Sequence, residues 1–154
     1  MNTKISRVIA VCGSNTLRSP TFEKILQLEL SKAGLTHIQV TSAGVDKTQY
    51  GQPADPKNAT YMLEYHGIQL ENHRSREVTE VSLTDTDLIV IAGGYVDRMS
   101  MESRYSPKTY HYLRVRNGEG IDSPYCSSTP RFNEMKAQID EAVLEVVAFL
   151  QNQS

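Results

Sequence analysis

Apolar residues fall along this chain in short runs and helical stripes, which predict alternating strands and helices. The first run, residues 6–11, is rich in β-branched side chains and predicts a strand. The run at 88–92 is apolar throughout and predicts a fully buried strand. Two further strands are predicted at 37–41 and 110–115, and Ser42-Ala43-Gly44 is predicted to be a turn.

Four helices are predicted between and after these strands. Ser19-Pro20 is typical of an N-cap followed by the first helical residue, and Gly34 is typical of a helix end. Asp55-Pro56 repeats this signature and opens a helix that Gly67 closes. The other two helices are predicted at 95–104 and from Thr129 onward. Apolar stripes line the first and last helices at Phe22, Ile25, Leu26, Leu30 and Ala33, and at Phe132, Met135, Ile139, Val143, Val146 and Leu150.

The predicted order is β-α-β-α-β-α-β-α, and such alternation builds a parallel sheet with helices on both faces. We therefore predict a single α/β domain over residues 1–154. Ligands of such sheets bind at the carboxyl ends of the strands. The loop after the first predicted strand begins at such an end, so a site is expected there.

Composition and charge argue against several classes of function. The net charge is −2 and no basic run stands out, so neither nucleic acid nor a membrane is predicted as a partner. No segment is suited to spanning a bilayer or to acting as a signal peptide, and a cytoplasmic location is predicted. The two cysteines, Cys12 and Cys126, suit a reducing compartment, and no Cys/His cluster has the spacing of a zinc site. We therefore predict neither a metal nor a cofactor.

The loop from Cys12 to Arg18 carries the clearest chemical signal. The residues between them allow the backbone to curl into a cup whose amide groups bind phosphate oxygens, and the following helix adds its positive end. Arg18 can bind two more oxygens with its planar guanidinium. The same positive field favours the thiolate of Cys12, which is the nucleophilic form. The predicted phosphate-binding residues are Gly13, Ser14, Asn15, Thr16 and Leu17 of this loop, together with Ser19 just after it.

Each residue alone has a plainer interpretation. A cysteine after an apolar strand is usually a small buried hydrophobe, and an arginine on a first helical turn is usually a solvated charge. The strand–loop–helix setting, together with Asn15 and Ser19, favours the functional interpretation. The patterns of the nucleotide-binding phosphate loop and of the dinucleotide fingerprint are both missing.

These motifs resemble those of the low-molecular-weight protein tyrosine phosphatases, whose members begin with a strand and then Cys-x5-Arg-Ser/Thr-Pro, as Cys12 to Pro20 does here. The resemblance covers essentially the whole chain and extends to Ser42-Ala43-Gly44, Asp55-Pro56, His73-Arg74-Ser75-Arg76 and Asp87-Leu88-Ile89. It implies a four-stranded parallel sheet. It also implies metal-independent hydrolysis of a phosphotyrosine protein or a small aryl phosphate, with inorganic phosphate as product.

The resemblance also implies a role for each matched residue. Cys12 would attack phosphorus and form a phosphocysteine, while Arg18 and the loop amides would bind the equatorial oxygens. Ser19 would hydrogen-bond Cys12 and stabilise its thiolate. Supporting residues would brace the loop from outside, with His73 in a structural role rather than an acid–base role: Asn15, Ser42 and His73.

The general acid departs from the family pattern. The family carries Asp-Pro-Tyr before the last helix, where this chain has Ser123-Pro124-Tyr125. Asp122, one residue earlier, is our predicted acid; a solvated loop charge is its alternative role, and Glu119 is a second candidate acid. A general acid contributes about 10²–10⁴-fold and matters most for poor leaving groups. We therefore expect slower hydrolysis of phosphotyrosine than of activated aryl phosphates.

Further positions near the loop carry weaker signals. Tyr50 and Tyr125 fall where the family places aromatic walls of the substrate cleft, which suit an aryl phosphate. An isolated exposed tyrosine is the alternative for Tyr50. Leu17 stands where many eukaryotic members have a second cysteine that protects the nucleophile from oxidation. Cys126 is either a partner for Cys12 or an ordinary loop thiol.

Two other functions remain open at this level. A non-catalytic phosphate-binding or regulatory protein would fit Ser123 at the acid position, although it would not need Cys12. A thioredoxin-coupled arsenate reductase shares the fold and loop, but its relay uses three cysteines and this chain has two. The residues favour a phosphatase.

Overall fold

A computed structural model describes residues 5–13, 15, 17–45, 51, 53–70, 72–121 and 129–153, without the side chains of 58 and 129–132. A four-stranded sheet in the order β2-β1-β3-β4 forms its centre, and every neighbouring pair is parallel. The strands are β1 (Arg7–Cys12), β2 (Gln39–Gly44), β3 (Leu88–Ile91) and β4 (Tyr112–Arg114). The predicted α/β fold with a four-stranded parallel sheet is confirmed.

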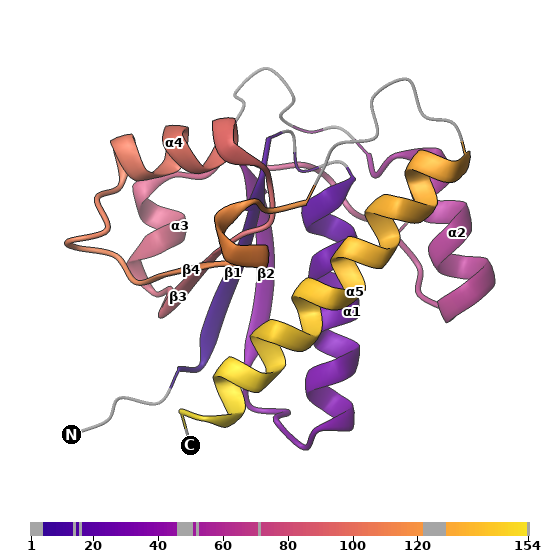
Figure 1. The fold of residues 1–154 in the computed structure, drawn as a ribbon, viewed down its shortest axis with the longest axis horizontal. Coiled ribbons are helices and arrows are strands. Elements are labelled where there is room, and N and C mark those ends of the chain that lie inside the picture. Colours follow the sequence, from indigo (N-terminus) through magenta and orange to yellow (C-terminus); the bar gives the residue numbers. More distant parts are fainter. Residues whose placement is uncertain are drawn as a thin grey trace.

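Helices cover both faces of this sheet (Figure 1). One face carries α1 (Arg18–Lys32), α2 (Pro56–His66) and α5 (Thr129–Gln151), and the other carries α3 (Glu80–Thr84) and α4 (Tyr95–Arg104). A 3-10 helix, η2 (Arg116–Gly118), follows β4. Within the described part of the chain, no helix is long and apolar enough to cross a membrane.

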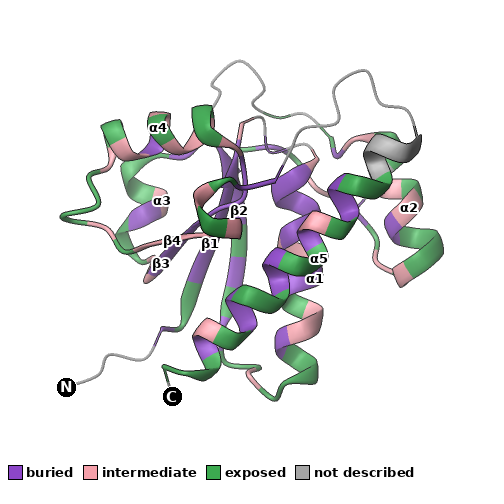
Figure 2. Ribbon diagram, viewed as in Figure 1, coloured by how far each residue is buried: buried purple, intermediate pink, exposed green. Residues whose placement is uncertain are grey.

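Alternate residues of the central strands pack on opposite faces of the sheet. Val8 and Ala10 of β1 join the core cluster beneath α1, α2 and α5, whereas Ile9 and Val11 join the cluster beneath α3 and α4. The central strands are therefore buried from both sides (Figure 2). Burial on both faces explains why their sequences are apolar without alternation.

The ends of some elements differ from the sequence-based predictions. Ser42-Ala43-Gly44 is not a turn, because parallel pairing with β1 continues through the register Cys12↔Gly44 and extends β2. This ladder supplies the backbone hydrogen bonds that a turn would otherwise provide. The predicted strand at 110–115 is confined to Tyr112–Arg114. The short α3 was not predicted, since five residues are too few to show a helical stripe.

The start of α1 also differs from the prediction. Ser19 is not the N-cap: the helix begins at Arg18, and Leu17 occupies the N-cap position without a side-chain cap. Pro20 is tolerated in this first turn because the N–H groups there have no partner within the helix. The Ser19 hydroxyl is thus available for other hydrogen bonds.

The other predicted helix boundaries agree closely with the structure. Gly34 and Gly67 follow α1 and α2 with φ angles of 77° and 65°, a region that favours glycine. Asp55 Oδ1 accepts a hydrogen bond from the Lys57 amide at 3.0 Å, as expected of a capping residue. Ala33 is exposed rather than part of the apolar stripe, because it lies beyond the last turn of α1.

Candidate active site

The predicted loop starts at the carboxyl end of β1, between the ends of β2 and β3, and leads into α1. Ser14 and Thr16 lie outside the described residues. Gly13 lies close to Arg18, and Leu17 packs its side chain against the core cluster under α1. Because parallel strands end at one edge, residues distant in the sequence meet around this loop.

Asn15 organises the loop from within, and its hydrogen bonds define the orientation of its amide. The Arg76 backbone N–H donates to Asn15 Oδ1 at 3.0 Å, which identifies the amide oxygen. Asn15 Nδ2 then donates to Ser19 Oγ at 2.8 Å and to Ser42 Oγ at 2.9 Å. Asn15 is fully buried and has φ 60°, a left-handed conformation that asparagine tolerates better than most residues.

Because both serine oxygens accept a hydrogen bond from Asn15, each serine hydroxyl still has its own hydrogen to donate. Ser42 Oγ lies 2.6 Å from Glu23 Oε1, and a carboxylate can only accept, so Ser42 donates to Glu23. Ser19 Oγ accepts from Asn15 and lies 3.0 Å from Cys12 Sγ, where either atom can be the donor; a Cys12 thiolate would accept the Ser19 hydrogen. Cys12 is buried. The network therefore places a hydroxyl that can donate beside a buried sulfur.

His73 lies outside this network and contacts the loop backbone. Its Nε2 is 2.8 Å from the carbonyl oxygen of Asn15. The His73–Arg76 segment thus holds Asn15 at two points, through the His73 ring and the Arg76 amide. All three predicted supporting residues, Asn15, Ser42 and His73, lie at the loop. Their geometry is compatible with bracing the loop.

Arg18 lies at the first position of α1 and is largely buried. Its Nη1 donates to the carbonyl oxygen of Ile121 at 3.0 Å, and its Nη2 lies 3.3 Å from Asp97 Oδ2. Asp97 belongs to the first turn of α4, and Ile121 follows η2. Neither partner was predicted from the sequence, and nor was Glu23, because their contacts arise from the sheet topology and have no local signal.

The remaining predicted site residues lie outside the described set: Tyr50, Asp122, Tyr125 and Cys126. Ile121 is the last described residue before the segment that carries the predicted acid. Glu119, the second candidate acid, is exposed at the end of η2.

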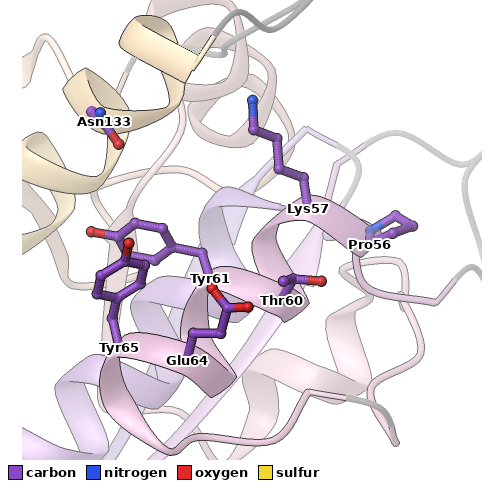
Figure 3. Close-up of a pocket in the computed structure, with 7 residues that line it drawn as sticks. All are labelled: Pro56, Lys57, Thr60, Tyr61, Glu64, Tyr65 and Asn133. Atoms are coloured by element: carbon purple, nitrogen blue, oxygen red, sulfur yellow. The ribbon is translucent and has the colours of Figure 1, made fainter.

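A separate pocket of about 480 Å³ lies between α2 and the beginning of α5 (Figure 3). The rings of Tyr61 and Tyr65 pack side by side there, with their centroids 4.6 Å apart. Among the residues that the structure describes, its lining contains no nucleophilic thiol and none of the loop residues: Pro56, Lys57, Thr60, Tyr61, Glu64, Tyr65 and Asn133. The loop around Cys12, rather than this pocket, is therefore the candidate active site.

Comparisons with known proteins agree with this geometry. Residues 7–154 match the family described as "Low molecular weight phosphotyrosine protein phosphatase". A relative from Ralstonia solanacearum, "Probable low molecular weight protein-tyrosine-phosphatase EpsP", is 30% identical over 141 residues, covering 90% of this chain and 92% of the relative. A "Protein-arginine-phosphatase" of Bacillus subtilis is 28% identical over 144 residues, with 90% and 93% covered.

Solved structures share the fold over nearly the whole chain. YfkJ from Bacillus subtilis superposes with a TM-score of 0.82 and 25% identity, covering 100% of this chain and 99% of that one. Vibrio vulnificus Wzb in complex with benzylphosphonate superposes with a TM-score of 0.78 and 24% identity, covering 94% and 98%.

Proposed function

Because this chain belongs to the low molecular weight phosphotyrosine protein phosphatase family, we propose that it hydrolyses phosphotyrosine or other aryl phosphate monoesters through a phosphocysteine on Cys12. Phosphatase activity is the property of the family; the intermediate, the residue roles and the substrate are our proposal. The observation that carries it is the buried Cys12 sulfur, which faces the Ser19 hydroxyl at 3.0 Å beside the start of α1.

In the first step, Cys12 Sγ attacks phosphorus, so that an S–P bond forms as the P–O bond to the aryl group breaks. The hydrogen that Ser19 directs at Sγ stabilises negative charge on the sulfur before the attack. Arg18 and the loop amides bind the equatorial phosphate oxygens and gain strength as the transition state forms. The N-terminus of α1, which has no side-chain cap, adds its positive end.

The second step removes the phosphoryl group from the enzyme. Asp122, having protonated the leaving phenolate, acts as a carboxylate base on water. Water attacks phosphorus, the S–P bond breaks, and inorganic phosphate and the Cys12 thiolate are released. Asp122 is covalently linked to Ile121, whose carbonyl contacts Arg18 at 3.0 Å, and this supports its choice over the exposed Glu119.

The alternative functions are not favoured by the named relatives, which are phosphatases. A cytoplasmic location remains a prediction from cysteine usage; it would keep the Cys12 thiol reduced and reactive.

The proposal is tested by metal-free steady-state hydrolysis of para-nitrophenyl phosphate and a phosphotyrosine peptide. Cys12→Ser is expected to abolish turnover of both substrates. Asp122→Asn is expected to slow the peptide more than the nitrophenyl ester, because nitrophenolate leaves without needing a proton. Glu119→Gln is the matched control and should leave this ratio unchanged.

Two outcomes would change the proposal. A phosphoarginine peptide belongs in the assay because one relative is named for that activity, and its preference over phosphotyrosine would replace the proposed substrate. Absence of all hydrolysis, with phosphate or vanadate still bound, would replace the enzyme by the non-catalytic binding protein.

A further inference from the structure

We propose that Asp97 is a positioning residue for Arg18, and that the missing side chains at Gly13 and Gly93 make room for its carboxylate. This role rests on the proposed function, since it takes Arg18 as the group that binds the phosphate oxygens. Its effect on anion binding can be measured whether or not the chain turns over a substrate.

The ion pair between Arg18 and Asp97 lies in a shielded place. The Arg18 side chain is 10% exposed and that of Asp97 is 13% exposed, and 3.3 Å separates Nη2 from Oδ2. Charges interact more strongly here than in bulk water, and an unpaired buried guanidinium would be costly. The pair is therefore strong enough to orient the Arg18 side chain.

Two acceptors restrain the guanidinium plane from different directions. Ile121 accepts from Nη1 at 3.0 Å, and Asp97 contacts Nη2. A guanidinium carries five N–H groups, so these contacts leave three for a bound oxyanion. Arg18 is thus held in place before any anion arrives, as a preorganised electrostatic site requires.

Glycines bring the two acceptor segments together. The Ile121 amide donates to the Ala92 carbonyl at 3.0 Å, which ties the segment after β4 to the end of β3. Gly120 has φ 69°, and a side chain there would collide with the carbonyl oxygen of Gly93. Glycine at position 120 therefore allows the backbones that carry Ile121 and Asp97 to pack directly against each other.

Glycines also make room for the Asp97 carboxylate itself. A Cβ at position 93 would lie 2.8 Å from Asp97 Cβ and would collide with Oδ2. A Cβ at Gly13 would lie 3.2 Å from Asp97 Oδ1 and 3.6 Å from Arg18 Nη2. The carboxylate thus fills the volume that a side chain at position 93 would take, next to the loop.

This arrangement predicts a different effect on two anions. Without the Asp97 carboxylate, Arg18 keeps its charge but loses one of its two restraints. Tetrahedral phosphate needs mainly the charge, whereas five-coordinate vanadate on the Cys12 thiolate resembles the transition state and needs the geometry. Loss of positioning should therefore weaken vanadate binding and catalysis together, while phosphate binding stays nearly the same.

The test compares Asp97→Asn, Gly93→Ala and the double variant with the wild type. Calorimetry gives the affinities for phosphate and vanadate, and para-nitrophenyl phosphate gives kcat/KM. Each single variant should lower vanadate affinity and kcat/KM on the order of 10–10²-fold, as misplacement of a catalytic group does. The double variant should lose no more than Asp97→Asn, because both changes remove one contact.

The control is Glu102→Gln, a substitution in α4, the helix that also carries Asp97. It removes an ion pair with Arg114 (2.7 Å), and the variant should bind both anions as the wild type does. Gly93→Ala keeps every polar group and carries the test if Asp97→Asn fails to fold. Equal loss of phosphate and vanadate affinity, or additive losses in the double variant, would overturn the positioning role.

The proposed function and the positioning role of Asp97 can be refuted independently of each other. A wild type that binds vanadate but hydrolyses nothing would refute the proposed function, and the vanadate comparison would still decide the role of Asp97. A wild type that binds neither anion would overturn both.

Discussion

At the scale of single residues, Asn15 determines how the loop is held. It contacts the Ser19 and Ser42 hydroxyls and the Arg76 amide, and its carbonyl oxygen contacts His73. A side chain that cannot form these bonds would leave buried polar groups unpaired. Most residues would also be strained at φ 60°.

Asn15→Ala is expected to lower the free energy of unfolding by about 3 kcal/mol, from unpaired buried polar groups at about 1–3 kcal/mol each and left-handed strain of about 1–2 kcal/mol. Urea denaturation measures this change. Asn15→Gly is the matched control, because glycine removes the hydrogen bonds without the strain and should lose less. Equal stability of Asn15→Ala and the wild type would contradict the structure.

Ser19→Ala is expected to slow alkylation of Cys12 by iodoacetamide at neutral pH by about tenfold or more, because a hydrogen bond to a charged group contributes about 1.5–3 kcal/mol. Peptide mass spectrometry distinguishes Cys12 from Cys126. Ser42→Ala removes the other hydroxyl bound to Asn15 but not the Cys12 contact, so it should slow the reaction less. The prediction is wrong if the two variants react at the same rate.

At the scale of elements, an ion pair ties α4 to the edge strand β4. Arg114 Nε and Nη2 bind the two Glu102 carboxylate oxygens at 2.8 and 2.7 Å. β4 has only three residues and lies at the end of the sheet, so few ladder hydrogen bonds hold it. The pair therefore helps to hold this short edge strand against α4.

The hydrogen bond from Arg114 holds the pKa of Glu102 below its usual value of 4.5. A carboxyl group with a lowered pKa in the folded state stabilises the fold above its unfolded-state pKa, and this contribution disappears as the pH falls through the lowered pKa. The difference in free energy of unfolding between wild type and Glu102→Gln should therefore be present at neutral pH and shrink in acid. Denaturant titrations at a series of pH values measure it, and a constant difference would contradict the assignment.

At the scale of the whole molecule, the parallel sheet collects the site at one edge. Cys12 ends β1, Ser42 lies near the end of β2, and Asp97 follows β3 through Gly93-Gly94. These groups are far apart in the unfolded chain, so the proposed anion site can form only in the folded state. Anion binding and folding are consequently linked.

Phosphate at about 100 times its Kd is expected to stabilise the fold by about 2.7 kcal/mol, which corresponds to a rise in Tm of roughly 5–10 °C for a chain of this length. Differential scanning calorimetry with matched sodium chloride controls measures the shift. Arg18→Ala should lose most of it. A similar shift in Arg18→Ala would show that the stabilising anion binds elsewhere.

The sequence alone determined the alternation of strands and helices, most helix ends and the position of the loop that we propose binds phosphate, because periodicity, capping residues and Cys-x5-Arg are local patterns. It misassigned Ser42-Ala43-Gly44 as a turn, since pairing with the distant strand β1 extends β2 through these residues, and Ser19 as an N-cap, since α1 already begins at Arg18. Only the tertiary structure decided which groups hold Arg18. Parallel strands bring Asp97 and Ile121 to it across long stretches of chain, and the space that Gly93 leaves open exists only once the two segments have packed.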